Sequence, residues 1–276
     1  MRKFTLALTM LVLLLSRPTP SFAAWGGKLD GDDHPMVGAM YGDFDGNGII
    51  TWDELICSGS YAGPSVDGQY DVYLTAAHCV APAGPFGFDT LYVSFDTDAQ
   101  DNGGIPEDLI ASKNWTWDPR FGHDSGNLYD SGLILLPAGS VQGIDPVQLP
   151  PAGLLDQMKR EGTLQHSVID LVGYGVIPIW NQRGGTHYEF DAKRREAQSQ
   201  VTGLTRSWLR LLQQRHATHR GGLCFGDSGS PQFLEGTTMV VSTTTGGNKN
   251  CNSINYDYRL DTTGAREFLG QYLPLP

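Results

Sequence analysis

The stretch that decides the fold and the chemistry is residues 224–231, which read Cys224-Phe225-Gly226-Asp227-Ser228-Gly229-Ser230-Pro231. A serine hydroxyl becomes an effective nucleophile when a base removes its proton and donors stabilise the resulting oxyanion. Glycines around Ser228 let a substrate carbonyl approach the backbone, and the N–H groups of Gly226 and Ser228 can point at the developing charge. Taken alone, the stretch also fits a glycine- and serine-rich turn without chemistry.

A candidate base lies far upstream, at His78 within Leu74-Thr75-Ala76-Ala77-His78-Cys79. No histidine follows Ser228 in the sequence, so this serine does not fit the order Ser, acid, His of an α/β-hydrolase. Position 230 is also serine, where the G-x-S-x-G motif requires glycine. The order His, acid, Ser remains open.

Together, the segments around His78 and Ser228 resemble the signatures of the trypsin/chymotrypsin family of serine proteases. The resemblance implies an all-β fold, in which two six-stranded antiparallel Greek-key barrels pack together and a C-terminal helix follows. We expect the N-terminal barrel over about 24–145, and the C-terminal barrel with the helix over about 146–276. The resemblance also implies that His78 and Ser228 hydrolyse peptide bonds in proteins or peptides, without a cofactor for catalysis.

The third member of such a triad must be an acid between His78 and Ser228. Asp130 precedes the apolar run 132–136 and resembles the family's D-I-A-L segment, with Ser131 and Gly132 in place of Ile-Ala. The family role of this acid is to accept the imidazole N–H and to fix the tautomer of the histidine. Asp124 is the second candidate for this role.

The first 23 residues have the pattern of a secretory signal peptide. Arg2 and Lys3 precede an apolar run over 6–15, and small residues follow at Ser21 and Ala23. We therefore expect a secreted protein, extracellular or periplasmic, without membrane association after cleavage, and a monomer. The net charge of −11 argues against nucleic acid as a partner, because phosphates require a basic surface.

Four cysteines in an exported chain predict two disulfide bonds, for which three pairings are possible. The family resemblance selects the bonds Cys57–Cys79 and Cys224–Cys251. The first would hold the histidine segment, and the second would tie the serine loop to a wall of the specificity pocket.

Ala24-Trp25-Gly26-Gly27, directly after the leader, resembles the Ile-Val-Gly-Gly terminus of an activated family member. In that family the new α-ammonium pairs with the acid before the catalytic serine, which is Asp227 here. We therefore expect cleavage after Ala23 to free Ala24 as the partner of Asp227.

The primary specificity pocket of the family has its base six residues before the catalytic serine, here at Gly222. A buried cation needs a paired charge, so a pocket without a carboxylate there should bind basic side chains poorly. We expect its wall at Ser242 and Thr244. If Thr244 takes the place of the family's glycine, small or medium apolar side chains fit best, whereas a shift by a residue or two reopens the pocket to aromatic ones.

Residues 43–54 match the calcium-loop pattern D-x-[DN]-x-[DN]-G-x5-E at every specified position. The flanks look like strands rather than the helices of a true EF-hand, so an acidic hairpin without metal is the alternative. A structural Ca²⁺ would have hard oxygen ligands, for which the candidates are Asp43, Asp45, Asn47, Ile49, Thr51 and Glu54.

Alternation predicts strands at 70–75, 90–95 and 208–212, and a capped helix is expected within 262–269. The basic cluster Lys193-Arg194-Arg195 is interpreted as a solvated loop. A second functional hypothesis is a secreted binding protein that kept the protease fold and lost turnover. It rests on Ser230, which replaces the glycine usual in the family.

Overall fold

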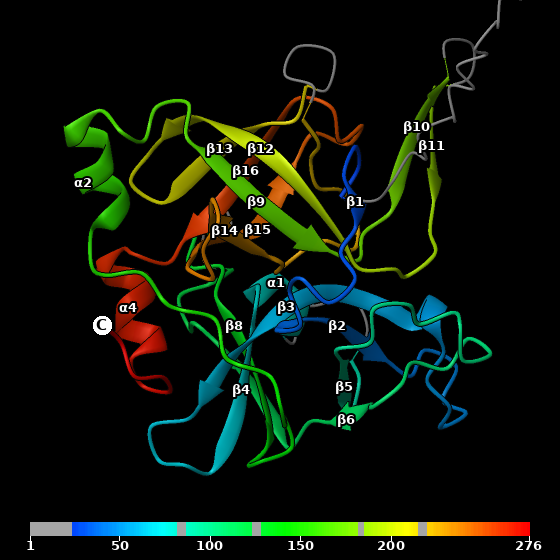
Figure 1. Ribbon diagram of the computed structural model, residues 1–276. Coiled ribbons are helices and arrows are strands. Elements are labelled where there is room, and N and C mark those ends of the chain that lie inside the picture. Colours follow the sequence, from blue (N-terminus) through cyan, green and yellow to red (C-terminus); the bar gives the residue numbers. More distant parts are fainter. Residues whose placement is uncertain (1–23, 82–86, 123–127, 182–184, 215–219) are drawn as a thin grey trace, which may run out of the picture.

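The computed structural model describes residues 24–81, 87–122, 128–181, 185–214 and 220–276. In this part of the chain, two seven-stranded antiparallel sheets lie one above the other (Figure 1). The lower, N-terminal sheet has the order β6-β5-β2-β3-β4-β8-β7. Its strands are β2 (Val37–Gly42), β3 (Leu55–Pro64), β4 (Tyr70–Thr75), β5 (Leu91–Ser94), β6 (Ile110–Ala111), β7 (Asn114–Trp117) and β8 (Gly132–Pro137).

The upper, C-terminal sheet has the order β1-β12-β13-β16-β15-β14-β9. A separate two-stranded hairpin projects beside it. The strands of the sheet are β1 (Lys28–Leu29), β9 (Val168–Gly173), β12 (Arg195–Leu204), β13 (Trp208–Leu212), β14 (Pro231–Leu234), β15 (Val240–Gly247) and β16 (Ile254–Arg259). The hairpin consists of β10 (Ile177–Asn181) and β11 (Gly185–Glu189).

The C-terminal sheet closes on itself, because β12 pairs with β9 as well as with β13. Six of its strands therefore form a barrel, and β1 extends one edge. In the N-terminal sheet, the outer strands β6 and β7 are not paired with each other within the described residues, so this half is a curled half-barrel. The predicted all-β architecture with a C-terminal helix is confirmed, and only the C-terminal barrel is closed.

Short helices occupy the connections and the C-terminus: η1 (Trp52–Glu54), α1 (Ala77–Val80), α2 (Leu154–Glu161) and α4 (Thr263–Leu269). The predicted cap of α4 is present, since the Thr262 hydroxyl accepts a hydrogen bond from the Ala265 N–H at 3.2 Å. Helix α2 lies in a segment that the sequence analysis left without structure, between Gly153 and Gly162, which both have positive φ. None of the helices among the described residues is long and apolar enough to cross a membrane.

Each end of the chain packs on the opposite half. Strand β1, near the N-terminus, pairs with β12 of the C-terminal barrel. Phe268 and Leu269 of α4 join one buried apolar cluster with Val72 of β4 and Leu133 of β8. The two halves therefore share a core and exchange their terminal segments.

A buried guanidinium also joins the halves. Arg194 is 1% exposed and its Nε donates to Asp30 Oδ2 at 2.7 Å. Its Nη1 donates to the carbonyls of Val37 and Phe95 at 2.9 and 3.1 Å. The interpretation of the basic cluster as a solvated loop is wrong for Arg194, and also for Arg195, which is 4% exposed, because buried acceptors compensate their charge.

We expect Arg194→Met to lower the free energy of unfolding by about 3 kcal/mol, because it removes the buried guanidinium partner of Asp30 and leaves this carboxylate with His34 alone. Denaturant unfolding measures the loss. Arg210→Met, at an exposed position of β13, is the matched control and should change stability by less than about 0.5 kcal/mol. Equal losses of unfolding free energy in the two variants would show that the buried Arg194–Asp30 pair does not stabilise the fold.

Candidate active site

His78 and Asp130 meet through two hydrogen bonds. The backbone N–H of His78 donates to Asp130 Oδ1, and the ring atom Nδ1 lies beside Asp130 Oδ2, both at 2.9 Å. Asp130 is fully buried, whereas the side chain of His78 is 26% exposed. An acid held in this way orients the imidazole and favours the tautomer whose Nε2 is free to accept a proton.

Neighbouring strand ends bring these two residues together. Thr75, the last residue of β4, pairs with Gly132, the first residue of β8. A Cβ atom at Gly132 would lie 2.6 Å from the Ala76 carbonyl oxygen and from Val80 Cγ2, a distance that no real side chain tolerates. Glycine at this position therefore lets the His78 turn approach the Asp130 segment.

The Ser228 loop rests on the same turn from the other half of the molecule. The carbonyl of Ser228 accepts a hydrogen bond from the Ser58 N–H at 2.9 Å. A Cβ atom at Gly229, whose φ is +77°, would lie 2.1 Å from Thr75 Oγ1 and 2.7 Å from the Ala76 nitrogen. The serine loop thus contacts the backbone directly before His78, and this contact requires glycine.

No hydrogen bond joins the Ser228 hydroxyl to the His78 ring within the described residues. Such bonds are often long without a substrate and shorten in the reacting complex. The structure therefore brings the serine and histidine segments together without forming the proton-transfer contact itself.

The predicted oxyanion donors are the N–H groups of Gly226 and Ser228. Neither donates a hydrogen bond to another described residue. Gly226 has a φ of +92°, a conformation that favours glycine, and its carbonyl accepts a hydrogen bond from Ser58 Oγ at 2.9 Å. Both N–H groups are thus without a protein acceptor among the described residues.

Asp227 is fully buried and bonded to backbone donors. Its two carboxylate oxygens accept hydrogen bonds from the N–H groups of Gly175 and Cys224, each at 2.8 Å. A Cβ at Gly173 or Gly175 would lie 2.2 or 2.3 Å from these oxygens, which explains the Gly-Tyr-Gly sequence beside them. Burial raises the pKa of Asp227 to about 7 against the opposing effect of the two amides.

The predicted partner of Asp227, Ala24, is also buried, in an apolar cluster with Leu223. Trp25 forms a bridge with Gly222, whose N–H donates to the Trp25 carbonyl at 3.0 Å. The described residues contain no ion pair with Asp227. Residues 24 and 25 therefore lie against the segment before Ser228. The predicted signal peptide, 1–23, and the second acid candidate, Asp124, lie outside the described residues.

Both selected disulfide bonds are present, Cys57–Cys79 with a Cα–Cα distance of 6.3 Å and Cys224–Cys251 with one of 5.3 Å. The first connects β3 to the helix that carries His78. The second connects the serine loop to the segment between β15 and β16.

A cavity of about 220 Å³ opens next to Ser228. Thr244 lines it, as expected, but its Oγ1 turns toward Ser230 Oγ at 2.7 Å and Gln232 Nε2 at 2.6 Å, so the methyl-bearing side chain is held by the barrel interior. The full lining is Leu223, Cys224, Phe225, Ser228, Thr244, Thr245, Gly246, Gly247, Asn248, Cys251, Asn255 and Tyr256.

Two predicted pocket residues do not line this cavity. Ser242 is fully buried in β15, opposite Gln232. Gly222 is not among the lining residues, and a Cβ atom there would meet Gln213 Cγ at 2.7 Å and Trp25 Nε1 at 2.9 Å. The wall is formed instead by Thr245, Gly246 and Gly247, because the strand is displaced by a bulge between Thr244 and Gly246.

The calcium-loop residues form the connection from β2 to η1 and β3. Carboxylate oxygens of Asp43, Asp45 and Glu54 lie within 4.8 Å of one another. Glu54 accepts the N–H groups of Phe44 and Thr51 at 2.8 and 2.9 Å. The other predicted ligands are placed in the same loop, where the Ile49 N–H donates to Asn47 Oδ1 and Thr51 Oγ1 donates to Asp53.

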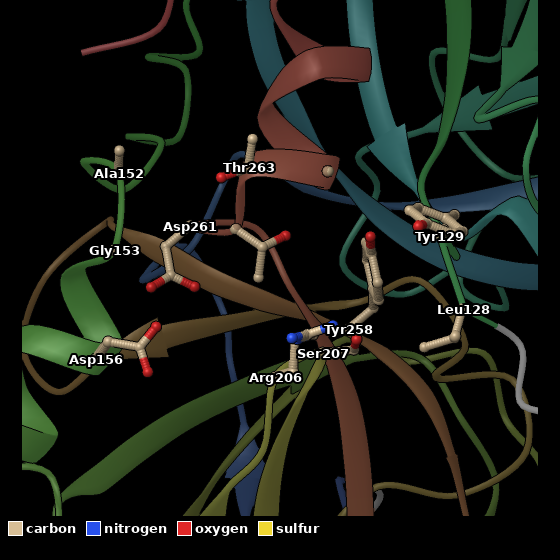
Figure 2. A pocket seen from close by; sticks show the side chains of 12 residues that line it. Leu128, Tyr129, Ala152, Gly153, Asp156, Arg206, Ser207, Tyr258, Asp261 and Thr263 are labelled. Carbon is tan, nitrogen blue, oxygen red and sulfur yellow. The ribbon is translucent and has the colours of Figure 1, made fainter.

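A larger hollow of about 650 Å³ lies where the residues before Asp130 meet the start of α4 (Figure 2). Its carboxylates, Asp156 and Asp261, both pair with the buried Arg259, at 2.7 and 2.9 Å. The two carboxylates of this hollow are therefore already paired with a buried arginine.

Asn255 and Asp257 were missed by the sequence analysis. Asn255 lines the cavity, whereas Asp257, two residues later in β16, is fully buried and is not among the lining residues. The available signal was the alternation of polar Asn255 and Asp257 with Ile254, Tyr256 and Tyr258 in the strand Ile254–Arg259.

The sequence profile of the trypsin family matches residues 48–263. No protein with a curated functional record matches the chain. Similar solved structures include the HL collagenase, with 17% identity, a TM-score of 0.61, and coverage of 89% of this chain and 95% of that one. Human heparin binding protein has 15% identity, a TM-score of 0.60, and coverage of 89% and 94%. The VesB protease of Vibrio cholerae has 14% identity and a TM-score of 0.59, and the match covers 88% of this chain and 65% of that one.

At these identities, the solved structures show the fold alone. The family profile covers more than half of the sequence, and the two sheets, with His78 and Asp130 in one half and Ser228 in the other, agree with it. The chain therefore belongs to the trypsin family of chymotrypsin-fold serine proteases.

Proposed function

We propose that the protein is a secreted serine endopeptidase with the triad His78, Asp130 and Ser228. The observation that carries this proposal is the double hydrogen bond between His78 and the buried Asp130, with the Ser228 loop packed against the residues before His78. The two disulfide bonds support an oxidising location outside the cytoplasm.

In the proposed reaction, His78 Nε2 takes the proton of the Ser228 hydroxyl while Oγ attacks the peptide carbonyl. The N–H groups of Gly226 and Ser228 hold the oxyanion of the tetrahedral intermediate. The imidazolium, stabilised by Asp130, then gives its proton to the leaving amine. Water hydrolyses the acyl-enzyme by the same steps and returns Ser228 to its starting state.

A second candidate function is binding without turnover on the same fold. It is favoured by the absence of a hydrogen bond between Ser228 and His78 in the described residues, and by Ser230. One similar structure is named as a heparin binding protein. The net charge of −11 opposes a polyanionic ligand for this chain, because like charges repel.

We expect a fluorophosphonate probe to label the wild-type protein and not Ser228→Ala, since only an activated serine reacts. Asp130→Asn should lower kcat for a peptide substrate by about 10⁴-fold, the loss that a wrong histidine tautomer produces in such a triad. Ser207→Ala, in the larger hollow, is the control and should keep both labelling and turnover. An unlabelled but folded wild-type protein would favour the binding function instead.

The activation proposal is that cleavage after Ala23 frees an α-ammonium group that pairs with Asp227. In the uncut chain, burial raises the pKa of Asp227 to about 7, above its unfolded value of about 4. The stability that this group contributes is therefore full below about pH 4 and is lost as the pH rises through about 7. An inserted ammonium would reverse the trend, because it lowers the pKa of the carboxyl.

Melting temperatures of wild type and Asp227→Asn, measured from pH 4 to 8, test this proposal. In protein that keeps residues before Ala24, the melting temperature of the variant should rise relative to that of the wild type as the pH rises, since asparagine cannot ionise. In protein that begins at Ala24, the melting temperature of the variant should decrease relative to that of the wild type over the same pH range. A gain in both forms would mean that Ala24 does not pair with Asp227.

The proposed structural Ca²⁺ would bind in the loop over 43–54, where three carboxylates converge. We expect millimolar Ca²⁺ to raise the melting temperature, because the cation relieves their repulsion and binds only the folded loop. Glu54→Gln should remove most of this gain, whereas Asp101→Asn, at an exposed turn, should keep it. Calorimetry without binding heat at millimolar Ca²⁺ would exclude the site.

A further inference from the structure

Asp130 lies at the centre of a tight three-residue turn. The Ser131 N–H donates to the Tyr129 carbonyl at 2.8 Å, and a bond from the third residue back to the first is the mark of a γ-turn. Tyr129 has a φ of +62°, a left-handed conformation that is unfavourable for a bulky side chain. Such a conformation persists only where the surrounding contacts hold it. The residues that contact the two flanks of this turn therefore set the direction of the Asp130 carboxylate.

Arg120 contacts the flank before Asp130 directly. Its guanidinium carbon lies 4.1 Å from the centre of the Tyr129 ring, which is a cation–π contact. The ring also lies close to the start of α4, since a Cβ atom at Gly264 would come within 3.1 Å of Tyr129 Cε1. Leu128 and Tyr129 line the larger hollow beside this helix (Figure 2). The Tyr129 ring is thus held by a guanidinium group and by the helix backbone.

Arg120 holds the flank after Asp130 through Asp118. The Asp118 N–H donates to the Ser131 carbonyl at 3.0 Å, and the side chain of Asp118 is fully buried. Arg120 Nε and Nη2 donate to its two carboxylate oxygens at 2.9 and 2.7 Å. Two parallel bonds of this kind fix the geometry of an arginine more strictly than a single contact. The same guanidinium therefore contacts the segments on both sides of the turn.

The remaining contacts of Arg120 reach the C-terminal helix. Nη2 also donates to the Gly264 carbonyl at 2.9 Å, and Nη1 donates to Glu267 Oε2 at 3.0 Å. Phe268 and Leu269 of the same helix are buried in the core. Arg120 thus ties the turn to an element that is itself anchored, which an isolated surface ion pair does not do.

We propose that Arg120 is a positioning residue for the triad. Through its contacts on both flanks, it holds the turn from which Asp130 binds His78. This inference rests on the proposed peptidase function. Both oxygens of Asp130 have to be placed, because one accepts the His78 backbone N–H and the other lies beside Nδ1, each at 2.9 Å. Misplacement of a catalytic group by about 1 Å can cost about 10²-fold in rate.

Steady-state kinetics on a peptide substrate test the proposal, with melting temperatures measured in parallel so that every rate refers to folded protein. Arg120→Met keeps the length of the side chain and removes its donors and charge. It should lower kcat by about 10- to 100-fold and change KM by less than about twofold, because only the step that needs a positioned His78 is impaired. Arg120→Lys keeps the charge without the fork of donors, so its kcat should lie between those of Arg120→Met and the wild type. Arg206→Met, at another arginine of the same hollow, is the matched control and should keep kcat.

Tyr129→Leu is a second variant, which leaves the Arg120–Asp118 ion pair intact. It removes only the ring that the guanidinium contacts, so the buried Asp118 keeps its partner. We expect this variant also to have a lower kcat than the wild type, with KM unchanged, even if Arg120→Met folds poorly.

The proton on His78 Nδ1 provides a measurement that needs no turnover. A proton held in a hydrogen bond to a buried carboxylate resonates far downfield in the proton NMR spectrum. We expect this resonance in the wild-type protein and in Arg206→Met, and its upfield shift or loss in folded Arg120→Met. If Arg120 only stabilised the fold, its substitution would lower the melting temperature and leave the resonance in place.

Unchanged kcat in folded Arg120→Met and Tyr129→Leu would overturn the proposal. The same downfield resonance in Arg120→Met and in the wild type would also overturn it, even if peptide hydrolysis is observed. A higher KM at constant kcat would assign Arg120 to substrate binding and refute positioning. If the resonance depends on Arg120 while the wild-type protein is not labelled by the fluorophosphonate probe, the positioning of Asp130 is supported and only the peptidase proposal fails.

Discussion

The packing of the two sheets against each other is the constraint on which the site depends. His78 and Asp130 belong to the N-terminal half and Ser228 to the C-terminal half, so their separation is set by the interface between the halves. Arg194 fixes that interface through the buried carboxylate of Asp30 and two carbonyls of the first sheet. A charge in this position has strict geometric requirements, because each of its donors needs a buried acceptor.

Glycine sets how closely the halves can approach at the site itself. Gly229 lets the serine loop touch Thr75 and Ala76, and Gly132 lets the histidine turn touch the start of β8. Gly175 makes room for the Asp227 carboxylate. In each case atoms of another segment occupy the space that a Cβ atom would need. The cleft is thus assembled from close backbone contacts between segments that are far apart in the sequence.

The parts that could be predicted from sequence were those whose chemistry is written in a short motif. The segments around His78 and Ser228 identified the family. The apolar run after Asp130 predicted the strand that follows this acid, which is β8. The specificity pocket could not be predicted in this way. Counting from Ser242 missed the bulge between Thr244 and Gly246, and counting back from Ser228 missed that Gln213 fills the space beside Gly222.

The exchange of terminal segments between the halves has a consequence for how the chain reaches this state. Strand β1 pairs with β12, and α4 completes the core around Val72 and Leu133, so these contacts join residues that are far apart in the sequence. Such a topology has a high contact order, and loop-closure entropy must be overcome before these contacts form. We therefore expect slow folding, because the apolar core of the N-terminal half is complete only after helix α4 has packed on it.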